Sequence, residues 1–401
     1  MNWLIAILIV IYNPKMSNFK INPTTSILNI SKSIYEKLWA SCKQPTPFTK
    51  WEFLTALEKT KCVGGSTGWI PYHLQLKDSQ QEVYGIIPNY VKFHSYGEYV
   101  FDWSWASAYQ NAGFNYYPKW CAASPFSPVT GTRIISKNDK ITSLFLQELM
   151  KSNLKENISS IHVLFCTGEE EKIGKSLGWL SRHGVQFHWE NKNYQSFECF
   201  LKELPQKKRK KIRAERRKVS TQQIECKTFY GKEIKEEHWE FFYKCYVQNY
   251  FDHGSTPYLN LNFFLTAAEL MPNNFLLVVA FHQPNNRPLA SSLVMVGDEP
   301  NNKILYGRYW GAVERVSCLH FEVAYYSVIN WAINNNIVRF EGGAQGEHKI
   351  ARGFEAKQTF SLHWIDNPEF RTPIDLFLKR ESAGIEEYLS RLDKTTMFKP
   401  N

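Results

Sequence analysis

The sequence predicts an α/β (α+β) protein made of two similar lobes that one long basic helix joins. Three observations lead to this prediction: the length of the chain, an order of helix and strand patterns that occurs twice, and a single cationic segment between the two series. At 401 residues the chain is too long for one ordinary core and predicts two or three units. Its 43% hydrophobic and 21% charged residues are typical of a folded globular protein.

The first series of patterns defines an expected domain over residues 47–196. Apolar residues at helical spacing alternate there with short runs that are typical of strands. The spacing predicts helices over 51–61, 102–111 and 141–151, and strands over 71–76, 82–91, 114–120 and 161–166. Such alternation is what an α/β domain needs.

The second series defines an expected domain over residues 226–380. Its clearest feature is a helix over 318–334, where apolar residues recur at i, i+3, i+4 and i+7. The patterns also predict a helix over 238–248 and strands over 275–281, 289–296, 304–310, 338–341 and 359–365.

The two series contain segments that are similar to each other. FDWSWASAYQNAGFNYYP begins at Phe101 and FEVAYYSVINWAINNNIVRFE begins at Phe321. Each consists of Phe and an acid, an aromatic-rich helix, a turn and a strand, which indicates an internal repeat of one α/β unit. Chance similarity between two amphipathic helices is the alternative interpretation.

The net charge of +10 comes mostly from one segment. Residues 207–218, KKRKKIRAERRK, hold nine Lys or Arg and one Glu, which together contribute +8. With no glycine from 197 to 222, the segment predicts one long exposed helix, assigned as a linker over 197–225. Its cationic face either contacts nucleic-acid phosphates or is only a solvated surface. The candidates for nucleic-acid binding are Lys207, Lys208, Arg209, Lys210, Lys211 and Arg213.

The two ends are expected to lie outside the domains, as an N-terminal extension over 1–46 and a C-terminal tail over 381–401. The apolar run WLIAILIVIY at 3–12 is shorter than the ~20 residues that a membrane span needs. We expect translation to begin at Met16; a short membrane-associated tail and a packed strand are the alternatives. Eight scattered cysteines without C-x-x-C spacing favour reduced thiols, and so a cytoplasmic protein without stable membrane insertion.

Two short motifs have the wrong surroundings for the chemistry that they suggest. Residues 64–68 match G-x-S-x-G, but a predicted helix precedes them and Pro71 follows, whereas a nucleophilic serine needs a strand before it and a helix after it. Gly174, Lys175 and Ser176 resemble the end of a phosphate loop whose first glycine is replaced by Glu169. The sequence therefore favours neither a serine hydrolase nor such a loop.

Three segments together resemble one known family. They are HSYGEYVFDWSWA with the later PFSPVTGTR, LYGRYWG with LHFE, and FEGGAQGEHKIARGF followed by HWI. Through them the chain resembles, over residues 47–378, the FemAB-like predicted N-acyltransferases, also called peptidoglycan biosynthesis or recognition proteins. The resemblance implies two tandem GNAT-like acyltransferase domains, joined here by the long basic helix.

The same resemblance implies an N-acyltransferase that moves an acyl or aminoacyl group from an activated donor to an amine acceptor such as a cell-wall precursor. The implied donor is acyl-CoA or aminoacyl-tRNA, with no tightly bound cofactor and no metal. In related enzymes that use aminoacyl-tRNA a helical arm is linked to tRNA, and the basic helix here is similar. The usual acetyltransferase pyrophosphate loop, Arg or Gln-x-x-Gly-x-Gly or Ala, is not recognisable, which favours a bulkier donor.

Two other functions stay open. One is a non-catalytic module that binds RNA or another ligand on the same fold. The other is an acetyl-CoA-dependent N-acetyltransferase of a small molecule.

The densest group of candidate site residues follows the predicted strand 338–341. Amide formation needs a base for the amine and donors for the oxyanion, which carboxylates, His, Tyr and backbone N–H groups can supply. The catalytic candidates are Glu347, His348, Glu341 and Tyr309. A polar turn with a few salt bridges is the alternative interpretation.

The remaining candidates are expected to bind substrate. In the second lobe they are Arg308, Trp310, His320, Glu322, Gly342, Gly343, Gln345, Lys349 and Arg352. In the first lobe they are His94, Tyr96, Glu98, Asp102 and Trp103, which are expected to line the same cleft from the other side. Asp102 as a helix cap and Glu322 beside a helix dipole have ordinary structural explanations as well.

Overall fold

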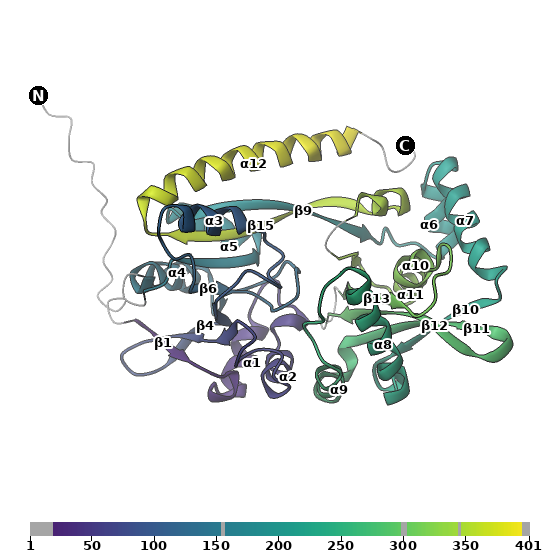
Figure 1. Cartoon of the computed structure of the whole chain (residues 1–401), viewed down its shortest axis with the longest axis horizontal. Coiled ribbons are helices and arrows are strands. Elements are labelled where there is room, and N and C mark those ends of the chain that lie inside the picture. The colour runs from purple at the N-terminus through teal and green to yellow at the C-terminus, as the bar shows by residue number, and fades with distance from the viewer. Residues whose placement is uncertain (1–18, 154–156, 298–302, 344–345, 395–401) are drawn as a thin grey trace, which may run out of the picture.

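The computed structural model describes residues 19–153, 157–297, 303–343 and 346–394, which form two lobes side by side along the long axis (Figure 1). The sequence predictions for residues 1–18, including the start at Met16, lie outside the described residues. The strands are β1 (Lys20–Thr24), β2 (Trp69–Pro71), β3 (His73–Lys77), β4 (Val83–Ile87), β5 (Asn89–Lys92), β6 (Lys119–Ala122), β7 (Ile135–Ser136), β8 (Ser160–Cys166), β9 (Leu180–Glu190), β10 (Ile224–Tyr230), β11 (Phe275–His282), β12 (Arg287–Val296), β13 (Ile304–Ala312), β14 (Arg339–Glu341) and β15 (Glu355–Ile365).

The helices cover the sheets and connect the strands. They are α1 (Lys32–Ala40), α2 (Trp51–Lys59), α3 (Trp103–Asn111), α4 (Asp139–Asn153), α5 (Gly168–Ser176), α6 (Phe197–Glu203), α7 (Gln206–Ser220), α8 (Glu236–Asp252), α9 (Leu261–Leu270), α10 (Leu319–Phe321), the π-helical turn η7 (Glu322–Tyr326), α11 (Ser327–Asn334), the 3-10 helix η8 (Glu347–Arg352) and α12 (Pro368–Lys394).

One sheet of eleven strands runs through both lobes. Its order is β10-β11-β12-β13-β14-β9-β15-β8-β6-β5-β2, and a smaller sheet in the first lobe has the order β1-β3-β4-β7. Among the described strands two neighbouring pairs are parallel, β13 with β14 and β6 with β8, and the other neighbours are antiparallel. From the central pair β9 and β15 outward, each lobe therefore repeats a succession of one antiparallel, one parallel and two antiparallel contacts, and the second lobe adds a third antiparallel contact between β11 and β10.

The lobes exchange the strands at the centre of this sheet. β9 follows β8 in the chain but pairs with β14 of the second lobe, and β15 follows β14 but pairs with β8 of the first. β9 and β15 also pair with each other from Leu180 to His188. Separating the lobes would break these backbone hydrogen bonds, so the sheet holds the two lobes as one body.

The repeat is present, but the two segments aligned in the sequence are not counterparts. The segment at Phe101 contains α3, which connects the antiparallel strands β5 and β6. The segment at Phe321 contains α11, which connects the parallel strands β13 and β14. The topological counterpart of α11 is α4, because it lies between the parallel strands β6 and β8. Shared aromatic composition produced the wrong alignment.

The basic segment forms two helices, and the single helix predicted over 197–222 is wrong. Leu204 has an extended backbone (ψ 150°) between α6 and α7, as expected for the residue before a proline. α7 buries Ile212 and Val219 against the core of the second lobe. The chain crosses between the lobes through β9, and α6 and α7 lie at the far end of the second lobe (Figure 1).

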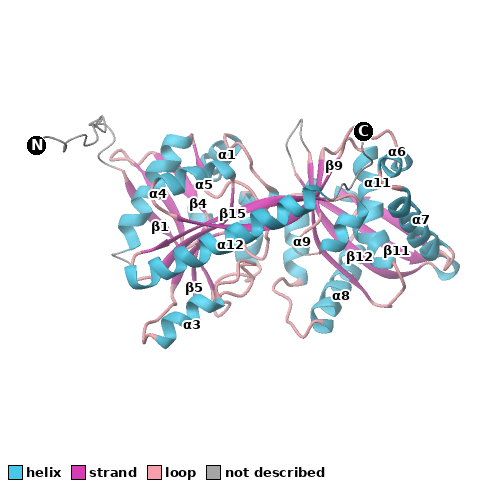
Figure 2. Ribbon diagram, turned by 90° about the horizontal axis from the view of Figure 1, so that it is seen from above, coloured by secondary structure: helices cyan, strands magenta, loops and turns pink. Residues whose placement is uncertain are grey.

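The last helix runs across both lobes. α12 lies along β9 and β15 in both views (Figure 2). Arg182 of β9 holds it through two bonds of 2.8 Å to the Glu381 carboxylate. α12 therefore continues through the boundary that the sequence placed at 380/381.

A shared apolar core closes the joint between the lobes. Phe48 of the first lobe packs edge-on against Tyr306 of the second at 5.5 Å, and Phe53 of α2 packs in the same way against Phe263 of α9. None of the helices that the structure describes has the length and apolar character needed to cross a membrane.

Candidate functional site

Each parallel pair of strands diverges and leaves an opening in the sheet. In the second lobe, Ile304–Tyr306 of β13 pairs with Arg339–Glu341 of β14, and β13 then continues to Ala312 without β14 beside it. Arg308 is the extra residue of a β-bulge against β12, because Leu293 faces Tyr309 while Val294 faces Gly307. Bulges of this kind often lie beside functional sites, where they redirect side chains.

Glycine backbone lines this opening where β14 ends. Gly343 has φ +82°, and a Cβ there would lie 3.1 Å from the Gly307 carbonyl oxygen. A Cβ on Gly342 would lie 2.7 Å from the Phe354 ring. Larger residues therefore do not fit at these positions, and the backbone of Gly342 and Gly343 is half-buried.

Two buried ionisable groups face each other beside the glycines. The Glu341 carboxylate oxygen Oε2 and His188 Nε2 are 3.8 Å apart, and neither atom has a hydrogen-bond partner within the described residues. Burial raises the pKa of Glu341 to about 8 and lowers the pKa of His188 to about 3. Near neutral pH the contact therefore joins a protonated carboxyl to a neutral imidazole and is not an ion pair.

Lys349 of η8 closes the inner end of the opening. Its Nζ donates a hydrogen bond of 3.0 Å to the Gly343 carbonyl oxygen, and its side chain is almost fully buried. Burial lowers the pKa of Lys349 to about 8, so a fraction of this amine is neutral under physiological conditions.

Aromatic and imidazole rings form the outer edge. Trp310 stacks on His320 with ring centroids 4.1 Å apart, and the Tyr325 hydroxyl lies 3.2 Å from His348 Nε2. Burial lowers the pKa of His348, with smaller contributions from the Lys349 and Arg352 charges. A neutral, exposed imidazole of this kind can accept a proton.

The adjacent candidates Glu347 and His348 point in different directions. Glu347 accepts a 2.8 Å hydrogen bond from the Tyr388 hydroxyl of α12, on the outside of the molecule. His348 points toward the rings of Tyr325 and His320 instead. Of the two, the geometry favours His348 as the base.

The other residues predicted in this lobe face elsewhere. Arg308 and Tyr309 turn to the first lobe, where both donate to the Phe126 carbonyl oxygen. Glu322 pairs with Arg216 of α7 at 3.0 Å. Arg352 is buried against α7, and Gln345 lies outside the described residues.

The corresponding opening of the first lobe, between β6 and β8, is filled by the chain itself. Arg133 is 2% exposed and donates to the carbonyl oxygens of Leu164 (2.8 Å), Gly131 (3.1 Å) and Val129. Together with the loop 124–133, this side chain leaves no room for a ligand between the strands. The same loop carries Phe126 to the second lobe.

A groove of about 930 Å³ lies between the lobes. The first lobe contributes Trp69, His94, Tyr96 and Phe126, and the second contributes the connection between α8 and α9. Phe126 stacks on Tyr258 across it at 4.9 Å. The groove contains aromatic faces, which suit a ligand with apolar surface.

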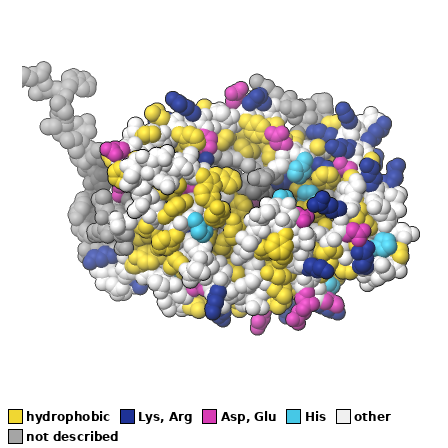
Figure 3. Space-filling model, in the orientation of Figure 1, with side chains coloured by type: hydrophobic (Ala, Val, Ile, Leu, Met, Phe, Trp, Pro, Cys, Tyr) yellow, Lys and Arg dark blue, Asp and Glu magenta, His cyan; other side chains and the backbone are white. Residues whose placement is uncertain are grey.

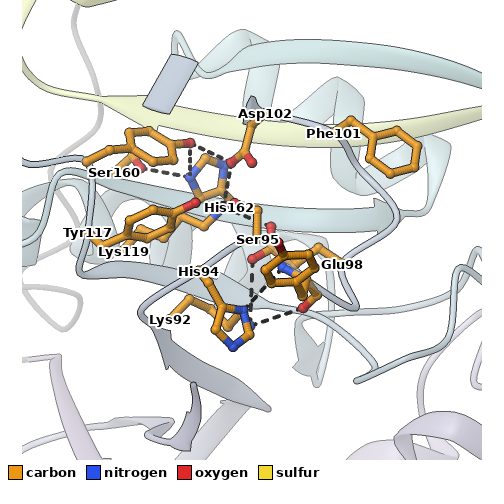
Figure 4. A network of polar contacts seen from close by, with 12 residues as sticks. Lys92, His94, Ser95, Glu98, Phe101, Asp102, Tyr117, Lys119, Ser160 and His162 are labelled. Carbon is orange, nitrogen blue, oxygen red and sulfur yellow. Dashed lines mark hydrogen bonds and ion pairs between the residues drawn. The ribbon is translucent and has the colours of Figure 1, made fainter. Parts of the chain in front are cut away.

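A buried polar network supports the rim of this groove (Figure 4). Lys119 donates to Glu98 (2.8 Å), to Asp102 and to Ser95 (2.9 Å). The Lys92 ammonium lies 3.9 Å from the other Glu98 oxygen and 3.7 Å from the Trp69 ring centroid. Asp102 therefore makes an ion pair and no side-chain helix cap.

The charges of this network balance in pairs. Burial opposes the ionisation of Asp102, but Lys119 outweighs it and the pKa of Asp102 falls. Burial raises the pKa of Glu98 to about 7 and lowers that of Lys92 to about 7. The network holds residues 94–102 in place and so presents His94 and Tyr96 to the groove, while Trp103 packs on Tyr96 at 4.9 Å.

The predicted nucleic-acid contacts lie on the surface of α7. Lys207, Lys210, Lys211 and Arg213 are exposed, and Lys208 and Arg209 are half-buried. Arg213 pairs with Glu198 at 2.5 Å, whereas within the described residues Lys207, Lys210 and Lys211 have no ion-pair partner. Figure 3 shows Lys and Arg side chains gathered at this end of the second lobe.

Sequence reasoning missed several residues of these sites. His188, Lys92, Lys119 and Arg133 lie on strands or next to one, where single polar residues give no motif. Tyr325 belongs to the apolar periodicity of the predicted helix 318–334, which gives no sign of its contact with His348. In the described residues no three His, Cys, Asp or Glu side chains come together as a metal site requires.

Two diverging parallel pairs, related by the succession of strand contacts and joined by exchanged strands, define the class as tandem GNAT-fold proteins. A family model agrees with this class over almost the whole chain. The protein belongs to the FemAB-like family of peptidoglycan biosynthesis/recognition proteins, whose model matches residues 29–400. Membership supports a transferase role.

Solved structures with TM-scores of 0.50 or more show the same fold at low sequence identity. FemX is similar with a TM-score of 0.54 and 10% identity, over 88% of this chain and 100% of that one. The C-terminal domain of an Agrobacterium fabrum protein assigned as a lysylphosphatidylglycerol synthetase has a TM-score of 0.50 and 7% identity, over 87% and 97% of the two chains. A tandem GNAT protein from the clavulanic acid biosynthesis pathway matches at 0.45 and 7%, over 87% and 99%. No curated protein sequence gives a significant match.

Proposed function

We propose that this protein transfers an acyl or aminoacyl group from an activated donor to an amine, with the reactive end of the donor at the opening between β13 and β14. The observation that carries the proposal is the opening itself. It combines half-buried glycine backbone at Gly342 and Gly343 with a neutral imidazole at its edge. Family membership and the FemX-like fold support the same class of reaction.

The proposed step uses residues of this lobe in distinct roles. His348 takes a proton from the acceptor amine, whose nitrogen then attacks the acyl carbon. The N–C bond forms, the C–O or C–S bond to the donor breaks, and the proton passes to the leaving oxygen or sulfur. Backbone N–H groups freed by the divergence stabilise the oxyanion. The acceptor, for which we propose a cell-wall precursor, lies in the aromatic groove between the lobes.

For the donor we propose aminoacyl-tRNA, and hence a cytoplasmic reaction. The exposed lysines of α7 offer phosphate contacts beyond those that acyl-CoA needs. The test is to measure tRNA affinity against salt for the wild type and for a variant with Lys207, Lys210 and Lys211 changed to Gln. The variant should bind more weakly and with a shallower salt dependence, because fewer counterions are released.

A matched control separates this effect from net charge. Lys20, Lys140 and Lys172 are exposed on the first lobe, and changing them to Gln removes the same charge. Equal weakening by both triple variants would contradict the assignment to α7. Transfer itself is tested by the loss of a radiolabelled amino acid from mixed aminoacyl-tRNA in the presence of a muropeptide amine. A donor that binds but never reacts would favour a non-catalytic binding module.

A further inference from the structure

A buried connection links the basic helix to the loop that carries His348. Glu215 lies on the inner face of α7 and is 8% exposed, and Arg352 ends η8 and is 2% exposed. Arg352 Nη2 donates to both carboxylate oxygens of Glu215, at 2.9 and 3.0 Å. α7 also makes an exposed pair, between its Arg213 and Glu198 of α6.

Arg352 also fixes the backbone at His348. Its Nη1 donates a 2.7 Å hydrogen bond to the His348 carbonyl oxygen, and its guanidinium lies 3.4 Å above the Phe321 ring centroid. One side chain thus holds α7 with one nitrogen and the residue favoured as the base with another. A planar guanidinium with several fixed donors is suited to this double role, whereas lysine is not.

The π-helical turn η7 contacts both sides of the connection. The Tyr326 hydroxyl donates to Glu215, while the neighbouring Tyr325 hydroxyl lies against the His348 ring. At the start of the turn, Glu322 pairs with Arg216 of α7. π-helical turns are rare and frequent at functional sites. Here the turn places consecutive tyrosines on the two elements that Arg352 joins.

We propose that Glu215 and Arg352 are positioning residues that couple occupancy of α7 by the nucleic acid of the donor to the placement of His348. The proposal rests on the donor proposed above. A donor held on α7 can react only if its acyl end meets the base at the opening between β13 and β14. The buried pair keeps the helix and the loop in one fixed relation, because breaking it leaves an uncompensated buried charge.

The test follows the imidazole signal of His348 by NMR while deacylated tRNA of mixed sequence is added to the full chain. In the wild type the signal should shift as tRNA binds, although α7 does not touch the ring. In Glu215→Gln the affinity for tRNA, measured by fluorescence anisotropy, should be unchanged and the shift lost. Glu198→Gln is the control, since it removes the exposed pair that joins α6 to α7 and should keep the shift.

A second variant tests the same pair in case Glu215→Gln does not fold. Arg352→Lys keeps the charge and removes the two-sided fork, and it should also lose the shift while it still binds tRNA. If the wild type binds tRNA and His348 does not respond, or if both variants respond as the wild type does, the coupling is overturned. If the wild type binds no tRNA, the proposed donor fails, and the coupling fails with it.

Discussion

In the first lobe the opening between β6 and β8 is filled by Arg133, whereas the opening between β13 and β14 in the second lobe is lined by glycine backbone, Glu341 and Lys349. The strand topology is the same in both. What differs is the segment after the first strand of each pair. In the first lobe it is the loop 124–133, which folds back into the opening and sends Phe126 across to Arg308 and Tyr309.

This difference indicates that the two lobes have different roles. The filled opening cannot take a donor, but its loop builds one wall of the groove between the lobes. Beside the second opening, Glu341 Oε2 and His188 Nε2 are buried without a hydrogen-bond partner among the described residues, which costs stability and is typical of functional sites. Under the proposed function, the repeated unit supplies structure in the first lobe and chemistry in the second.

The largest effect is expected at the edge of the second opening. His348→Ala should lower the rate of transfer by ~10²–10⁴-fold, the usual cost of removing a general base. Glu347→Gln is the control, because that carboxylate faces Tyr388 on the outside and should leave the rate near that of the wild type. The rate of transfer from radiolabelled aminoacyl-tRNA is measured for both variants and for the wild type. An equal loss of transfer rate in both variants would show that His348 is not the general base.

A different effect is expected in the filled opening. Arg133→Met should lower the free energy of unfolding by about 2–4 kcal/mol, because buried carbonyl oxygens lose their donor. Donor affinity should stay unchanged. Arg287→Met, which removes an exposed pair with Glu314, is the control and should cost less than about 1 kcal/mol in urea unfolding. A stable Arg133→Met protein that no longer binds donor would assign ligand binding to the first lobe.

The smallest effect concerns Glu341 and pH. Burial raises its pKa to about 8. Between about pH 5 and 8 the unfolded carboxyl is ionised while the folded one is protonated, so stability falls as pH rises. Glu341→Gln should remove this fall, worth on the order of 2 kcal/mol across the window. Urea unfolding at several pH values measures it, with Glu347→Gln as an exposed control. Parallel curves for wild type and Glu341→Gln would mean that this carboxyl is ionised in the fold.

Much of the fold followed from local patterns, because apolar periodicity reflects burial directly. The strands β11, β12 and β13 and the helices α2, α4 and α8 lie within a few residues of their predicted places. β9 was missed, since it carries Arg182, His183, Gln186 and His188 along its length and pairs across the lobes. A strand buried by exchange does not show the alternation that sequence reasoning requires.

The candidate site could be predicted only in part. The glycines and charged residues after β14 indicated the second opening from the sequence alone. Glycine lets a ligand come close to the backbone, and the charged residues follow it directly in the chain. Nothing local distinguished Glu347 from His348, whose directions depend on α12 and η7. Lys119 and Arg133 were not predicted for a similar reason: the Lys119 partners lie 17 to 24 residues away, and Leu164, which Arg133 joins to its loop, lies 31 residues away.

The most direct test of the division between the lobes is hydrogen exchange with and without a non-hydrolysable, amide-linked aminoacyl-tRNA. Protection should appear in residues 307–312 and 346–354, beside the opening of the second lobe, and on α7. No change should appear in residues 119–133, which already fill the opening of the first lobe. Protection confined to 119–133, with none beside β13 and η8, would contradict the central claim that the second opening receives the donor.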